Sequence, residues 1–103
     1  MELTVTDRIV LLNVLPQEAN LTTIRIMREL RDELSFSEDE QAELEMREDD
    51  GRIFWNAETE HVKDVAIGTR ARAAIITAFE ELDRSGKFKD AMLDTYAKFE
   101  EAE

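Results

Sequence analysis

The sequence has 103 residues, of which 43% are apolar and 37% are charged, so it is long and apolar enough to form one domain with its own core. Its 25 acidic and 13 basic side chains give a formal net charge of −12, which opposes direct binding to nucleic acid and to anionic membranes. Cysteine is absent, which excludes disulfides, thiolate metal sites and cysteine nucleophiles. Because the sequence shows no basic leader and no apolar run near the ~20 residues of a membrane span, we expect a cytoplasmic protein.

Residues 6–15, TDRIVLLNVL, predict a helix with Thr6 as its N-cap, Asp7 in its first turn and its end before Pro16. Apolar side chains cover almost every direction around this helix, so it must be buried on all sides. It is then either the central helix of the fold or a helix with one side against another copy or a partner. A buried strand is the competing interpretation, because Ile and Val also favour strands.

Residues 20–34 form the clearest amphipathic helix of the sequence, with Asn20 as the expected N-cap. The opposite face carries three arginines, but acidic residues alternate with them and supply i,i+4 pairs such as Arg25–Glu29. We therefore interpret that face as solvated rather than as a phosphate-binding stripe. The core-facing positions are Thr23, Ile26, Met27, Leu30 and Leu34.

The acidic segment that follows has two separate local causes. Ser37 and Glu40 fit a capping box at the start of a short helix, where the helix dipole favours carboxylates. The alternation of Leu44, Met46 and Glu48 then predicts a strand, and residues 49–51, DDG, predict a tight turn.

The strand that returns from this turn contains the apolar residues 53–55. Ile53 and Trp55 share one face of the strand, and we expect this face to point to the core. Phe54 then points the other way. Whether Phe54 is covered by the fold or is free for a partner is a question that the sequence raises.

The last part of the chain predicts mainly helices. Residues 57–64 predict a loop and residues 65–68, VAIG, predict a short strand or an extended lead-in. A second long helix covers residues 69–85, with Gly86 as its C-cap, and a last helix covers residues 88–100. The core stripes of these two helices are Ala71, Ile75, Ala78, Phe79 and Leu82, then Phe88, Met92, Tyr96 and Phe99.

Together these elements predict a small single domain of the α+β class over residues 1–103. We expect its helices to pack on a short antiparallel, hairpin-based sheet of two or three strands.

No catalytic or metal-binding motif fits the sequence. Aligning Gly51 with the glycine of an EF-hand loop puts Met46 and Ala57 at its first and twelfth positions, where carboxylate ligands are needed. His61 is the single histidine, which is too few for a zinc site, and the sequence shows no partner constellation for it as a general base. We therefore expect a protein that is not an enzyme and that binds no metal and no cofactor.

The sequence resembles small acidic proteins that phages and prophages encode, in the stretches ELTVTDRIVLLNVLP, then REL and LSFSEDE, then VAIGTRARAAIITAFEELDRSGKF and YAKF. Packing residues, caps and turns carry this resemblance, so it transfers no active-site residue. What it implies is a phage or prophage origin, a location in the host cytoplasm and a role in binding a host or viral protein.

We therefore expect a noncatalytic module that binds a protein partner, with carboxylates that steer a basic partner and an aromatic side chain that anchors it. One version is a nucleic-acid mimic that occupies the basic channel of a host protein. The alternative is a virion or assembly component that forms homo-oligomers through the helix at residues 6–15. A third hypothesis is a small hydrolase that uses His61 with nearby carboxylates. The candidate partner-binding residues are Glu38, Asp39, Glu45, Asp49, Asp50 and Phe54.

Overall fold

The computed structural model describes residues 1–59 and 61–101, the last of these by its backbone alone. It has the α+β class that the sequence predicts, with helices and short antiparallel strand pairs in one small domain. In chain order the elements are β1 (Glu2–Thr4), α1 (Val5–Val14), α2 (Leu21–Leu34), α3 (Glu38–Glu43), β2 (Arg47–Asp49), β3 (Arg52–Phe54), β4 (Val62–Asp64), α4 (Thr69–Arg84), the 3-10 turn η1 (Asp90–Met92) and α5 (Leu93–Glu101).

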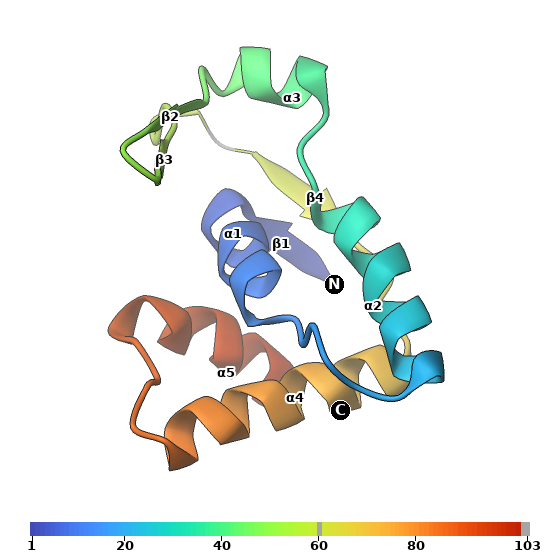
Figure 1. Ribbon diagram of the computed structural model, residues 1–103. Coiled ribbons are helices and arrows are strands. Elements are labelled where there is room, and N and C mark those ends of the chain that lie inside the picture. The colour runs from blue at the N-terminus through green and yellow to red at the C-terminus, as the bar shows by residue number, and fades with distance from the viewer. Residues whose placement is uncertain (60, 102–103) are drawn as a thin grey trace.

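The helix α1 lies at the centre of the molecule, between α2, the β1–β4 pair and the layer formed by α4 and α5 (Figure 1). Its side chains Val10, Leu11 and Val14 are buried in the core. The first of the two alternatives for this helix is therefore confirmed. Around it pack Leu3, Met27, Leu30, Leu34, Val65, Ala71, Ile75, Phe79 and Phe99.

The start of α1 differs from the prediction, in which Thr6 was the N-cap. Thr4 caps the helix, because its hydroxyl accepts a hydrogen bond from the Asp7 amide at 3.1 Å. The Asp7 carboxylate returns to the Thr4 amide at 3.0 Å and completes a capping box. Thr6 lies exposed in the first turn of α1. The residue three positions after it is Ile9, which cannot complete a capping box.

The strands β1 and β4 form an antiparallel pair that the sequence did not predict. Leu3 lies opposite Lys63, and the Val65 amide extends the pairing by donating to the Met1 carbonyl at 2.9 Å. The predicted loop at residues 57–64 is wrong at β4. Of the two alternatives for residues 65–68, the strand is wrong, because this segment has no regular structure; it forms the lead-in to α4, and Val65 is buried in the core.

The long helices α2 and α4 agree closely with their predictions. Asn20 caps α2 by accepting from the Thr23 amide at 2.9 Å. Gly86, at φ +71°, ends α4 in a Schellman motif, in which its own amide donates to the Asp83 carbonyl and the Lys87 amide donates to the Leu82 carbonyl. The last predicted helix instead begins at residue 90 with η1, and only then continues as α5.

The hairpin of β2 and β3 has the predicted turn, with both Asp50 and Gly51 at positive φ. Its first strand starts at Arg47 rather than at Leu44, because Leu44 is the buried C-cap of α3. The prediction that Ile53 faces the core is wrong, since 45% of this residue is exposed. The hairpin lies with α3 at the end of the molecule opposite α4 and α5, so no helix of the main core covers it (Figure 1).

Candidate protein-binding surface

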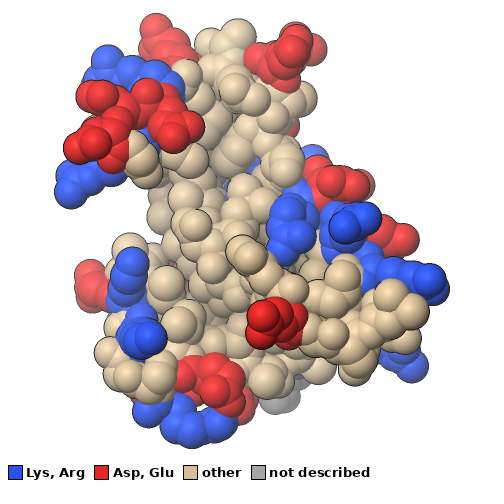
Figure 2. Space-filling model, viewed as in Figure 1, with Lys and Arg blue, Asp and Glu red and all other residues tan. Residues whose placement is uncertain are grey.

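Residues 37–56, which contain α3, β2 and β3, form a separate projecting part that we call the acidic lobe. The lobe has eight carboxylates and two arginines, a net charge of −6, which is half the net charge of the whole chain. Figure 2 shows acidic side chains gathered at the top of the molecule over this lobe, beside basic ones. Half of the net negative charge thus lies on 20 of the 103 residues.

The structure places all six predicted partner-binding residues on the acidic lobe, and each of them is exposed. Glu38 and Asp39 lie in the first turn of α3. Asp49, Asp50 and Phe54 belong to the hairpin or its turn.

The sixth residue, Glu45, follows α3 at φ +53°, and its carboxylate accepts from the Asn56 side chain at 3.2 Å. The ring of Phe54 lies 5.4 Å from the Arg47 guanidinium, measured to the ring centroid, yet 39% of Phe54 stays exposed. Phe54 is thus only partly covered by the fold.

Beside the hairpin lies a small groove that the sequence did not predict. Its volume is about 290 Å³, and we call it the anchor groove. Three of its apolar residues are half-buried and the fourth, Ile53, is exposed. The sequence did not predict the groove because separate segments form it, namely α1, the α2–α3 connection and the hairpin. The one local signal is Phe36, an aromatic residue between two serines. The lining residues are Leu12, Ser35, Phe36, Gln41, Met46, Arg47, Glu48 and Ile53.

The fully buried Arg8 of α1 holds the acidic lobe to the rest of the molecule. Its Nε donates to the Leu34 carbonyl at 3.0 Å and its Nη2 to the Ser35 carbonyl at 2.6 Å. Its Nη1 donates to Glu40 Oε2 at 2.6 Å, and the guanidinium lies 3.9 Å from the centroid of the Phe36 ring. One side chain therefore fixes the end of α2, the connection after it and the first turn of α3.

The Glu40 carboxylate is held in its charged form by this arrangement. The hydrogen bond from Arg8 lowers the pKa of Glu40 far below its usual range and outweighs the opposing effect of burial. The Ser37 amide and His61 lower this pKa further. Glu40 therefore stays ionised and paired over the whole physiological pH range.

His61 lies in the same network, with its Nε2 2.8 Å from Glu40 Oε2. This geometry joins a histidine to a carboxylate, as in many catalytic pairs, but Arg8 and the Ser37 amide already occupy that carboxylate. Because these bonds stabilise its charged form, Glu40 is a weak proton acceptor. The network stabilises the junction between the lobe and the rest of the molecule, and the role of His61 in it is structural.

A second buried network joins α1 to α5 and contains Asp7. Its Oδ1 accepts from the Thr95 hydroxyl at 2.6 Å, and its Oδ2 forms an ion pair with Lys98. Burial alone would raise the pKa of Asp7, but the hydrogen bonds from Lys98, Thr95 and the Thr4 amide together lower it below its ordinary value. Asp7 thus acts as a charged tie between two helices of the core.

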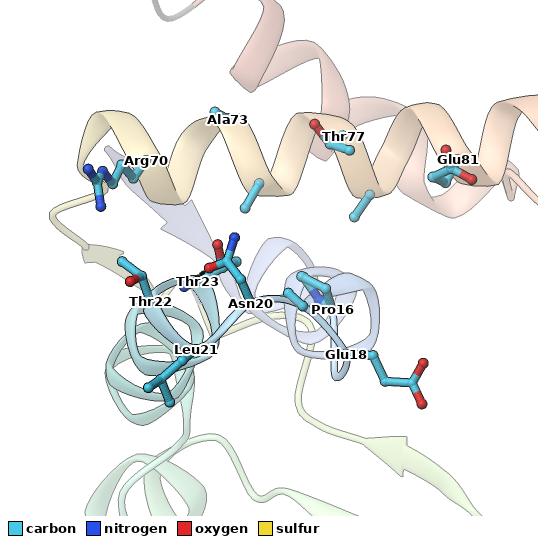
Figure 3. Close-up of a pocket in the computed structure, with 13 residues that line it drawn as sticks. Pro16, Glu18, Asn20, Leu21, Thr22, Thr23, Arg70, Ala73, Thr77 and Glu81 are labelled. Atoms are coloured by element: carbon cyan, nitrogen blue, oxygen red, sulfur yellow. Dashed lines mark hydrogen bonds between the residues drawn. The ribbon is translucent and has the colours of Figure 1, made fainter.

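A second groove, of about 940 Å³, runs between α4 and the start of α2. In Figure 3, Glu18 and Leu21 point away from α4, and Arg70 and Glu81 lie at opposite ends of the lining part of α4. Most of the remaining lining residues are alanines and threonines. Its two charged residues on α4 are thus far apart, and the groove brings together no cluster of charged side chains, so we do not choose it as the candidate site.

Among residues 1–59 and 61–101 no three His, Asp or Glu side chains come close enough together to hold a metal ion. Within the same ranges no helix is both long enough and apolar enough to cross a membrane. Comparison of the chain with family models, with curated proteins and with solved structures found no match.

Proposed function

We propose that this protein is a noncatalytic module that binds another protein through the acidic lobe. The observation that carries the proposal is the exposure of Ile53 and Phe54, at 45% and 39%, on the part of the chain with half of the net charge. Every residue of β2 and β3 is exposed, so the fold gains little from apolar side chains there. A partner that covers them would gain apolar burial, at about 25 cal/mol per Å².

The charge around these residues indicates what kind of partner the lobe attracts. The same lobe carries the exposed carboxylates of α3 and the hairpin, and a field of negative charge speeds the encounter with a basic surface. An apolar centre with a charged rim is also the usual anatomy of a protein interface. In the mimic version of the proposal, the carboxylates take the place of phosphates in the basic channel of a host protein.

Two further observations favour a binding role over the other hypotheses. His61, the residue on which a hydrolase would depend, shares a carboxylate that Arg8 already pairs, which supports a noncatalytic protein. Leu11 and Val14, which would bind another copy in the assembly hypothesis, are inside the monomer. The resemblance to small phage and prophage proteins supports a host or viral protein as the partner.

Affinity capture from a host-cell lysate with three forms of the full chain tests the proposal. The unmodified chain is compared with the double variant Ile53→Ser, Phe54→Ser and with Leu93→Ser, which changes an apolar residue that is 54% exposed but lies in α5. We expect the unmodified chain and Leu93→Ser to capture the same protein and the double variant to lose it.

The salt dependence of this capture tests the electrostatic part. Binding should weaken strongly as salt rises from about 0.1 M to about 0.5 M, because the Debye length then falls well below 10 Å. Capture that is equal for all three forms would show that the lobe is not the binding surface. Capture that does not change with salt would contradict the mimic version.

A further inference from the structure

We propose that the anchor groove takes one bulky aliphatic or aromatic side chain from a partner segment in which Lys or Arg residues flank that side chain. This inference rests on the proposed function and adds the chemistry of the partner. It follows from the size of the groove, from the contacts that fix its walls and from the charge around it.

The size and lining of the groove suit a side chain better than a small molecule. Its volume of about 290 Å³ lies just below the ~300–1,000 Å³ of typical ligand pockets. The apolar part of its surface comes from Leu12, Phe36, Met46 and Ile53. The other four lining residues are Ser35, Gln41, Arg47 and Glu48. The four apolar residues give the groove its contact area for an apolar side chain.

Contacts of the lining residues with Arg8 and with one another hold the walls of the groove in place before any partner arrives. The Arg8 guanidinium packs on the ring of Phe36 at 3.9 Å, and Gln41 Nε2 donates to the Phe36 carbonyl at 3.0 Å. On the other wall Ile53 lies opposite Glu48 in the register of the hairpin. A preformed groove lowers the entropic cost of binding, so a single anchor can contribute substantially to affinity.

The charge of the lobe selects basic flanks on the anchor. Two arginines, Arg47 and Arg52, are the basic residues of the lobe, and the guanidinium of Arg47 lies near the Phe54 ring. An acidic segment, or a second copy of a chain with a net charge of −12, is repelled by this surface. Glu40 is half-buried, and the other carboxylates of the lobe are all exposed: Glu38, Asp39, Glu43, Glu45, Glu48, Asp49 and Asp50.

Short synthetic peptides with a fluorescent label test the proposal by the anisotropy change on binding to the full chain. The first peptide has a central Leu with Lys flanks, the second replaces this Leu by Ser, and the third keeps Leu but replaces every Lys by Glu. We expect the first peptide to bind at least about tenfold more tightly than the second, and the third not to bind. Equal affinity for the first two peptides, or no binding of the first, would overturn the proposal.

Variants of the chain show where the first peptide binds. Ile53→Ser and Met46→Ser should each lower its affinity by about tenfold, because each removes an apolar wall of the groove, whereas Leu93→Ser should leave it unchanged. Equal loss in Leu93→Ser, or no loss in Ile53→Ser, would place the peptide elsewhere and overturn the proposal. If the lobe is needed for capture from lysate but the peptides show no such preference, the proposed function stands and only the inferred partner chemistry is wrong. If the lysate capture does not depend on the lobe and the peptides show no preference, the proposed function and the inferred partner chemistry are both wrong.

Discussion

At the scale of single residues, the fold depends on two neighbouring buried charges, Asp7 and Arg8. They point to different parts of the molecule, since Asp7 bonds to Thr95 and Lys98 of α5 while Arg8 bonds to the α2–α3 connection and Glu40. Most of α1 is covered by the fold, with Thr6 and Asn13 exposed, and a charged residue that is buried in such a helix must be paired. The sequence therefore contained a signal for these buried ion pairs, because Asp7 and Arg8 stand side by side in a mainly apolar helix.

We predict that Arg8→Met lowers the free energy of unfolding by about 3–5 kcal/mol, because it leaves Glu40 and two backbone carbonyls without their buried donor. Urea unfolding followed by circular dichroism measures this change. The control is Arg84→Met, which removes an exposed ion pair with Glu81 and should cost less than about 1 kcal/mol. Similar costs for the two variants would show that Arg8 does not hold the lobe.

The lowered pKa of Glu40 predicts a loss of stability in acid. In the unfolded chain this carboxyl binds a proton below its ordinary pKa of 4.5, whereas in the folded chain it stays charged to lower pH. Its contribution is thus complete above about pH 5 and is lost as the pH falls through the folded pKa. In urea unfolding, the stability difference between the unmodified chain and Glu40→Gln should be largest near pH 7 and should shrink towards about pH 3. A difference that is constant with pH would contradict the assignment.

At the scale of elements, α3 and α4 end in the same way but with different residues. In both helices the residue after the C-cap has positive φ, and the amides at and after that position donate back into the last turn. In α4 this residue is Gly86, which accepts the conformation freely, but in α3 it is Glu45 at φ +53°. The end of α3 therefore carries backbone strain of about 1–2 kcal/mol.

We predict that Glu45→Gly unfolds at a higher urea concentration than Glu45→Ala, by about 1 kcal/mol in the free energy of unfolding. Both variants remove the hydrogen bond from Asn56, so their difference reports the backbone alone. Equal stability of the two variants would show that the positive φ at this position is not strained.

Local signals explain which elements the sequence could predict. The bounds of α2 and α4 follow from Asn20 and Gly86, whose effects reach only a few residues. The pairing of β1 with β4 joins segments about 60 residues apart through three-residue strands, and such short strands show no alternation to detect. The anchor groove was missed for the same reason, since each of its walls is ordinary alone and the groove exists only where they meet.

At the scale of the whole molecule, the chain divides into a body packed around α1 and the acidic lobe. The radius of gyration is 13.9 Å, slightly above the ~13 Å expected for a compact domain of 100 residues, as a projecting lobe would produce. Buried residues of the core come from β1, α1, α2, α4, α5 and the ends of α1 and β4, whereas the lobe contributes Leu44 to the buried set. Most of the apolar burial therefore lies in the body, and the lobe adds little to it.

This division predicts a wide range of amide hydrogen exchange rates within the small domain. Amides of α1 should exchange only through global unfolding, because the core covers this helix, whereas amides of β2 and β3 should exchange at least about 100-fold faster by local opening of an exposed hairpin. Exchange followed by NMR or mass spectrometry measures both rates.

Arg8→Met should speed exchange in α3 more than in α4, since it releases the lobe from the body. Uniform protection would mean that the lobe belongs to the same cooperative unit, and the exposed apolar residues of the hairpin would then need another explanation than a partner.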